Sequence, residues 1–163
     1  MKFLTGLFLL IAQLGAHEVE GYVSAGMVSH HFGSYQEGDY NENHDAYGAE
    51  LLYDKRYALA YLHFDNSRNR TTDILAAGYR YDLYGPFGVT LVAGYQHGYC
   101  FDGIKSVECT EGKDNDGFAF LPMLHYRHKY FMVDLMSQGT MVALKLNIKL
   151  YGEGGFFPFL DNP

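Results

Sequence analysis

The sequence of 163 residues has few charged residues, four prolines and two cysteines, and it contains no tryptophan. Charged residues make up 19% of the chain, and 12 Lys and Arg against 19 Asp and Glu give a net charge of −7. The acidic balance and the lack of a basic cluster exclude nucleic acid as an expected partner. Because 48% of the residues are hydrophobic, intrinsic disorder is excluded as well, and the length allows one domain.

Residues 1–16, MKFLTGLFLLIAQLGA, have the pattern of a secretory signal peptide. Lys2 is followed by an apolar run over 3–12 and then by the small residues Gly15 and Ala16. A membrane anchor would need about 20 apolar residues, and Gln13 ends the run too early. We therefore expect cleavage near Ala16 and export of the mature chain, in which no later segment is apolar enough for a spanning helix.

The two cysteines, Cys100 and Cys109, lie nine positions apart in a polar segment that contains glycine. In an oxidising compartment they are expected to form a disulfide that closes a small surface loop. A metal site is the alternative, but His97 is the only other good ligand nearby in the sequence, whereas structural zinc sites usually have four protein ligands. We therefore expect neither a metal nor another cofactor.

Apolar and polar residues alternate with a period of two through most of the mature chain. Such alternation is the signature of strands with one apolar face. In 141–150, for example, Lys145, Asn147 and Lys149 share the polar face. The pattern predicts eight strands, at residues 20–31, 45–53, 57–65, 72–83, 89–99, 117–126, 130–136 and 141–150.

The predicted connections fall into short turns and longer loops. The short ones are 54–56, 84–86, 127–129 and 137–140, and the longer ones are 33–43, 66–70 and 100–116. An even number of strands of about ten residues, with short turns at one end and long loops at the other, is typical of bacterial outer-membrane proteins. We predict an all-β fold, an eight-stranded antiparallel up-and-down transmembrane β-barrel over 17–151, followed by a C-terminal tail at 152–163.

A secreted β-sandwich or a lipocalin-like barrel would also show alternation. Tyrosine and phenylalanine gather near the predicted strand ends, as the interfacial girdles of membrane barrels do. The face opposite the apolar one carries charge of both signs, which a sandwich core would have to desolvate and a narrow barrel can pair inside; it holds Glu50, His63, Asp65, Arg80, Asp134 and Lys145. Eight strands leave an interior just filled by side chains, so an open solute pore is not expected.

Polar residues that could take part in catalysis concentrate at the long-loop end. Ser29-His30-His31-Phe32 leaves the first strand, Tyr40-Asn41-Glu42 enters the second, and residues 64–70 connect the third and fourth. A serine hydroxyl becomes reactive when a base such as histidine lies within reach. An Asn-Ser pair between strands is also ordinary turn chemistry, so spacing alone leaves both interpretations open.

The order of these segments resembles the outer-membrane lipid A palmitoyltransferase family, which includes short relatives carried by phages. The matching stretches are 29–32, 40–42, 64–67, 76–79 and 120–124, and the resemblance covers about residues 21–150. It implies transfer of an acyl chain from a phospholipid to lipid A in the bacterial outer membrane. The expected partners are therefore outer-membrane lipids, and the barrel is expected to act as a monomer.

The resemblance assigns the family's essential histidine to His31, with His30 as the near alternative, and its serine to Ser67. His31 would be the base towards the acceptor hydroxyl, and Ser67 with nearby amides would polarise the ester carbonyl. The family's aspartate falls on Asn66, whose amide cannot stabilise an imidazolium as a carboxylate does. Asp65, one residue earlier, is the candidate substitute.

Four further residues are expected to bind substrate: Tyr40, Arg68, Arg70 and Pro122. Pro122 has no N–H to donate to a neighbouring strand, so it suits a gap in strand pairing. In the family such gaps admit lipid sideways into the barrel. The alternative is that Pro122 marks an ordinary, tolerated irregularity of the strand. Arg68 and Arg70 are candidates for lipid A phosphates, or else are solvated loop charges.

The sequence leaves two alternatives open. An esterase would use His31 and Ser67 with water as the acceptor. A non-catalytic barrel would serve in surface interaction or exclusion through its loops. Asn66 bears on the choice, because an Asp-Ser pair would have favoured the enzyme.

Overall fold

A computed structural model of the chain describes residues 18–32, 40–67, 69–98, 117–138, 141–152 and 155–156. The expected signal peptide at 1–16, Arg68, Cys100 and Cys109 lie outside these described residues, as does most of the tail. Within the described ranges, no helix is long and apolar enough to cross a membrane.

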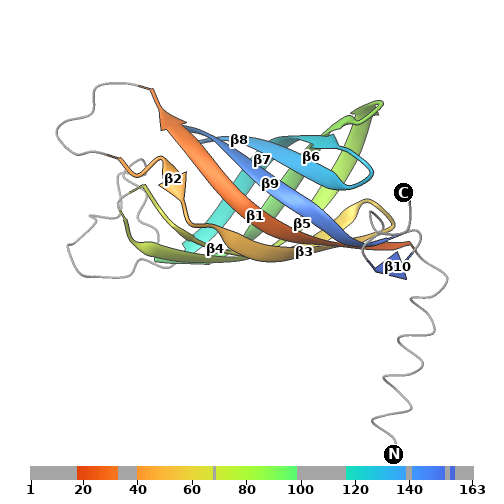
Figure 1. Ribbon diagram of the computed structural model, residues 1–163. Helices are drawn as coiled ribbons and strands as arrows, with labels where there is room; N and C mark the ends of the chain where they lie inside the picture. The colour runs from red at the N-terminus through yellow and green to blue at the C-terminus, as the bar shows by residue number, and fades with distance from the viewer. Residues whose placement is uncertain are drawn as a thin grey trace, which may run out of the picture.

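The described residues form ten strands in one antiparallel sheet. Their bounds are β1 (Val19–His31), β2 (Asn43–His44), β3 (Tyr47–Tyr53), β4 (Tyr57–Asp65), β5 (Thr71–Tyr84), β6 (Phe87–His97), β7 (Gly117–Arg127), β8 (Phe131–Gln138), β9 (Met141–Gly152) and β10 (Gly155–Phe156). The sheet order is β10-β9-β8-β7-β6-β5-β4-β3-β1-β2, and β9 also pairs with β1. That last pairing closes the eight long strands into a barrel (Figure 1).

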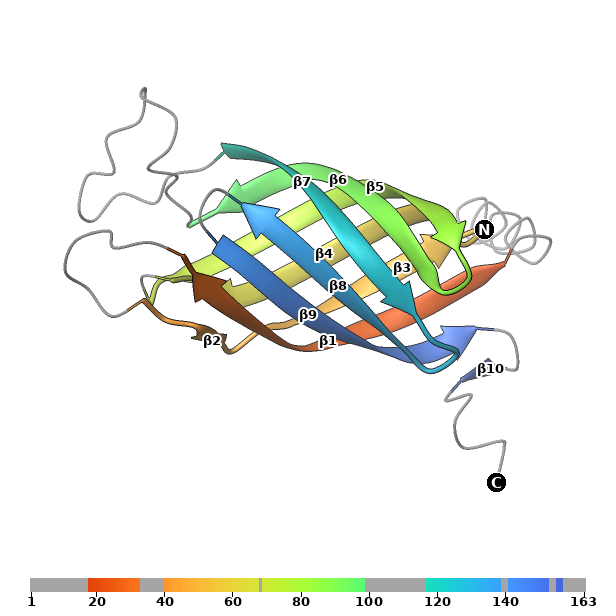
Figure 2. The same cartoon turned by 90° about the horizontal axis from the view of Figure 1, so that it is seen from above.

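The turns at 54–56, 84–86 and 127–129 lie at one end of the barrel and the long connections at the other, as expected, but the short connection predicted at 137–140 joins β8 to β9 at the end of the long connections. The turn at 54–56 and the turn after Tyr84 lie at the end where Gly21 pairs with Tyr151, which we call the short-turn end. Asp54 and Lys55 have φ of 51° and 58°, a conformation that suits a tight hairpin. His31, paired with Met141, marks the opposite or long-loop end (Figure 2).

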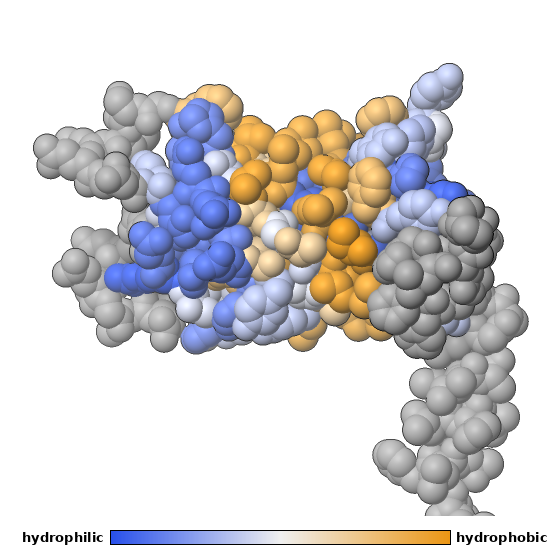
Figure 3. All heavy atoms as spheres, in the orientation of Figure 1, coloured by the Kyte–Doolittle hydropathy of each residue, from blue (hydrophilic) through white to orange (hydrophobic). Residues whose placement is uncertain are grey.

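Many large apolar side chains point outwards, and most of the charged side chains within the strands point inwards. In β9, Leu144 and Leu146 are exposed, whereas Lys145, Asn147 and Lys149 are buried. Figure 3 shows an apolar belt across the middle of the visible face, with hydrophilic residues on either side of it. This is the reverse of a water-soluble barrel and matches a wall solvated by lipid. The predicted fold class, an eight-stranded antiparallel transmembrane β-barrel, is confirmed.

The facing of β4 differs from the prediction. His63 and Asp65 were expected inside, but Ala58 and Phe64 are the buried residues of this strand, and His63 faces outwards, where it contacts Asp73. The physical reason is that β4 is apolar on both faces, since Leu59 and Tyr61 are exposed and the inward residues line a cavity. Glu50, Arg80, Asp134 and Lys145 lie inside, as expected.

A bulge in β1 brings the end of this strand into the barrel. The register towards β9 shifts between Ser24 and Gly26, and Gly26 has a φ of 149°, a conformation that favours glycine. Ser24 is buried before the bulge and Met27 after it, so the inward positions change parity. As a result Ser29 faces inwards at the long-loop end, and His31 follows on the same face.

The wall between β1 and β3 is irregular near the long-loop end. β3 pairs with β1 from Val19 to Ser24, and the two-residue β2 takes over at Met27 and Val28. The Ser29 amide then donates to the Glu42 carbonyl (2.8 Å). The Asn41 amide donates to the Ser67 carbonyl (2.9 Å), so the segment 40–44 joins the end of β1 to the turn after β4. We call this assembly the mouth.

Candidate functional site

A cluster of four charged side chains fills the middle of the barrel. Arg80 lies 2.5 Å from Glu50 and 3.6 Å from Asp134, and Lys145 lies 3.1 Å from Asp134 and 3.6 Å from Glu50. Two cations and two carboxylates therefore balance, in an environment that would penalise an unpaired charge. Lys149 pairs with Glu20 nearer the short-turn end.

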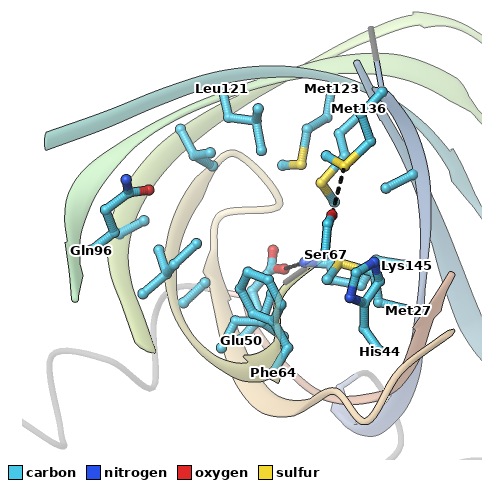
Figure 4. Close-up of a pocket in the computed structure, with 17 residues that line it drawn as sticks. Met27, His44, Glu50, Phe64, Ser67, Gln96, Leu121, Met123, Met136 and Lys145 are labelled. Atoms are coloured by element: carbon cyan, nitrogen blue, oxygen red, sulfur yellow. Dashed lines mark hydrogen bonds and ion pairs between the residues drawn. The ribbon is translucent and has the colours of Figure 1, made fainter. Parts of the chain in front are cut away.

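An apolar cavity lies between this cluster and the mouth. Glu50 and Lys145 reach it from the charged cluster, and His44 and Ser67 reach it from the mouth. Its wall is dominated by flexible methionines and aliphatic side chains, among them Met27, Leu62, Ile74, Val92, Leu121, Met123, Met136 and Met141 (Figure 4). Methionine adapts its shape to apolar ligands, so the cavity suits a flexible hydrocarbon with a polar group at the mouth.

Ser67 lines this cavity and is buried. Its side chain points into the cavity in Figure 4, and its hydroxyl has a weak contact with the sulfur of Met141 at 3.9 Å. Met141 is also the strand partner of His31. The structure thus brings Ser67 and His31 to the same part of the mouth, with no hydrogen bond between their side chains.

His31 is held at the mouth by Tyr40 and Glu42. Its ring stacks on Tyr40 with centroids 4.4 Å apart and 10° between planes, and its amide donates to the Glu42 carboxylate at 3.3 Å. Nδ1 of His31 is shielded from solvent yet has no hydrogen-bond partner among the described residues. His30, the near alternative, is exposed and contacts Glu42 at 3.0 Å.

Asn66 acts within the turn that carries Ser67. Its side-chain amide donates to Thr72 Oγ1 at 3.0 Å and to the Gly98 carbonyl at 3.1 Å. Its Oδ1 accepts from the amide of Arg70 at 3.2 Å. A carboxylate could not donate to those two acceptors, so local hydrogen bonding explains the asparagine at this position. The Arg70 side chain is exposed.

Pro122 lies where the pairing of β7 with β8 ends. Residues 117–126 of β7 all pair with β6, and Pro122 pairs with Leu91. The pairing of β7 with β8 runs only from Arg127 to Met123. Within the described part of the chain, residues 117–122 therefore have no partner in β8, and this gap adjoins the cavity residues Leu121 and Met123.

The mouth also holds a histidine that sequence reasoning did not select. His44 is buried, and its Nε2 lies 2.8 Å from Ser29 Oγ, while its Nδ1 lies 2.5 Å from the Asp65 carbonyl. Its ring packs edge-on against Phe64. Ser29 belongs to a stretch singled out in the sequence, but its contact with His44 depends on the folding of β2 onto β1.

No protein-family model and no curated protein matches this chain. Among solved structures it is similar to a de novo designed transmembrane β-barrel, with a TM-score of 0.51 and 11% identity over 81% of this chain and 94% of that one. It is also similar to Ail, the attachment invasion locus protein of Yersinia pestis, solved with the heparin analogue sucrose octasulfate. That match has a TM-score of 0.41 and 15% identity over 82% of this chain and 95% of that one. At such identities the likeness concerns the fold: the chain is an eight-stranded barrel of the transmembrane class.

Proposed function

We propose that this chain is a lipid-modifying enzyme of the bacterial outer membrane that transfers an acyl chain from a phospholipid to lipid A. The observation that supports this most is the apolar cavity between the charged cluster and the mouth, with Ser67 and His44 at its mouth end. An acyl chain placed in this cavity brings its ester carbonyl to the mouth. The motifs shared with the palmitoyltransferase family point to the same chemistry.

The mouth supplies groups for the two parts of acyl transfer. Nδ1 of His31, without a partner among the described residues, is available to accept a proton from the acceptor hydroxyl. The hydroxyl of Ser67, whose one side-chain contact among the described residues is to a sulfur, is available to donate to the ester carbonyl. Tyr40 stacks on His31 and fixes its ring plane. With water as the acceptor, the same residues would make the protein an esterase.

The gap beside Pro122 supplies a route for lipid from the bilayer. Leu121 and Met123, on either side of Pro122 in sequence, line the cavity, and so does Met136 of β8, which pairs with Met123 where the ladder ends beside the gap. Because neighbouring strands are not paired there, an acyl chain can pass between them without breaking a ladder. The phospholipid would then reach the site from the side, and Arg68 and Arg70 are proposed to meet the acceptor's phosphates.

Lipid analysis of outer membranes tests the enzyme proposal. Membranes with the wild-type protein should contain more highly acylated lipid A and lysophospholipid than membranes without it. His31→Ala and Ser67→Ala should reduce this conversion by about 10²-fold or more. His63→Ala is the matched control, because His63 lies outside the barrel and should leave conversion unchanged. Identical lipids in all samples would favour a non-catalytic surface protein.

Filling the cavity tests the acyl-binding part of the proposal. Ala143 is almost fully buried in β9 and lines the cavity. Ala143→Leu should place a larger side chain in that space and shift the transferred chains towards shorter lengths, as measured by mass spectrometry of lipid A. Leu144→Ile, on the outer face of the same strand, is the control. An unchanged chain-length distribution with Ala143→Leu would contradict the assignment of this cavity.

A further inference from the structure

Ser29 and His44 form a hydroxyl–imidazole pair that the mechanism above does not use. The Ser29 hydroxyl and Nε2 of His44 are 2.8 Å apart, and the other ring nitrogen faces the Asp65 carbonyl. The two residues come from β1 and β2, fifteen positions apart. Both are buried at the mouth.

The geometry defines which ring nitrogen of His44 carries the proton. A carbonyl oxygen can only accept a hydrogen bond, so Nδ1 beside the Asp65 carbonyl must be the donor. Nε2 of the neutral ring is then left with a lone pair, and this lone pair faces the Ser29 hydroxyl. That is the tautomer in which a histidine takes a proton from a serine nucleophile, with the orienting group on the far nitrogen.

We propose that Ser29 is a nucleophile and His44 its general base, and that the pair forms an acyl-serine intermediate from a lipid ester. The proposal rests on the proposed function for the nature of the substrate. It replaces direct transfer between lipids with two successive steps. The Asp65 carbonyl and Phe64 are positioning groups, because they orient the His44 ring and touch no substrate.

The pair lies where the ester of a bound acyl chain would be. His44 lines the cavity, and Ser29 follows Met27, another lining residue, on the inward face of β1. The hydroxyl of Ser67 opens onto the same cavity and would donate to the carbonyl oxygen as negative charge develops. Burial keeps bulk water away, which strengthens these interactions.

The two steps balance in atoms and protons. Ser29 Oγ attacks the ester carbon while its proton moves to His44 Nε2. The bond from that carbon to the lipid oxygen then breaks, and the leaving alkoxide takes the proton from His44. In the second step an acceptor hydroxyl attacks the acyl-serine, its proton passes to His44, and Ser29 Oγ leaves and takes it back. His31 in this scheme aligns the acceptor.

A buried Ser–His pair can instead serve only to clamp β2 against β1. The interior offers a matched structural pair for comparison: Ser24 is also buried on the inward face of β1, and its hydroxyl donates to Asn147 at 2.8 Å. An amide oxygen is not a base, so Ser24 should be inert. The difference between Ser29 and Ser24 therefore isolates the effect of the imidazole.

The test is covalent labelling of the folded full-length protein in detergent micelles with a long-chain alkyl fluorophosphonate, followed by peptide mass spectrometry. We expect the adduct on Ser29 of the wild type. Ser29→Ala and His44→Gln should lose labelling by about 100-fold or more, and Ser24→Ala should keep it. Because the wild-type adduct itself identifies the nucleophile, the test stands even where a variant does not fold.

The outcomes also separate this proposal from the proposed function. An adduct on Ser67, no adduct at all, or labelling that persists in folded His44→Gln would overturn the Ser29–His44 pair. Undiminished lipid A acylation in cells carrying Ser29→Ala would overturn it too, while leaving the proposed function in place. Labelling of Ser29 together with unchanged membrane lipids would support the pair and contradict transfer to lipid A.

Discussion

Arg80 is the largest of the fully buried side chains and holds the charged cluster together. Its guanidinium contacts Glu50, Asp134 and the sulfur of Met132. Removing one partner from a buried ion network leaves the others uncompensated, which costs far more than the loss of a surface pair. The stability of the barrel should therefore depend strongly on this residue.

Arg80→Met should lower the free energy of unfolding by about 3–5 kcal/mol, because Glu50 and Asp134 would lose a buried cation. The measurement is urea-induced unfolding in micelles, followed by the gel mobility of unboiled samples. Arg56→Met, in the exposed turn between β3 and β4, is the control and should cost less than about 1 kcal/mol. Equal unfolding midpoints for the two variants would contradict the buried network.

At the scale of elements, the unpaired start of β7 is the least regular part of the wall. Phe118 and Phe120 on its outer face are exposed, and pairing with β8 begins only at Met123. Where a strand has no partner on one side, its backbone N–H and C=O groups on that side lack the hydrogen bonds of a ladder. A proline lowers the number of such groups, because it has no N–H to donate. We therefore propose that Pro122 disfavours closure of the gap by pairing with β8.

Pro122→Val should let the β7–β8 ladder extend towards the long-loop end and narrow the gap. We expect several-fold slower turnover of phospholipid supplied in bilayer vesicles, with unchanged turnover of a short-chain ester dissolved in water. Leu124→Val, on the outer face of the paired part of β7, is the control. An equal loss for both substrates would mean that Pro122 acts on the site rather than on lateral access.

The strands could be predicted closely because alternation is a local signal. The interval 57–65 is both predicted and observed for β4, and the other long strands shift by two residues or fewer at every end. The facing was predictable only where one side is charged, as in β9. The predicted facing of β4 was wrong, because Leu59 and Leu62 make both sides of that strand apolar. In β1 the alternation is weakened by the bulge at Gly26.

At the scale of the whole molecule, three parts of the interior follow one another from the middle of the barrel to the long-loop end: the charged cluster, the apolar cavity and the mouth. Motif order pointed to Ser67 and His31, which do lie at the mouth. The pairing of His44 with Ser29 was not predictable, because it depends on β2 folding back onto β1 and on the bulge that turns Ser29 inwards. Neither the position of β2 nor the bulge is signalled by a recognisable spacing of residues in the sequence.

The apolar belt makes a depth-dependent prediction that separates a membrane barrel from a water-soluble one. Leu91 lies in the middle of β6 and Leu83 near the short-turn end of β5, and both are exposed. In a bilayer, an arginine on the lipid-facing surface destabilises the folded barrel by about 2–4 kcal/mol at mid-depth and by about 0–1 kcal/mol near the interface. In water, arginine at either exposed position would cost little.

Leu91→Arg should therefore fold poorly into phospholipid vesicles, and Leu83→Arg should fold nearly as well as the wild type. Folding is read from the difference in gel mobility between boiled and unboiled samples, and Leu91→Ala corrects for lost packing. If both arginine variants fold equally well, the belt does not lie in lipid, and the lateral route to the cavity loses its basis. If only Leu91→Arg fails, the wall is solvated by lipid, as the proposed lateral route to the cavity requires.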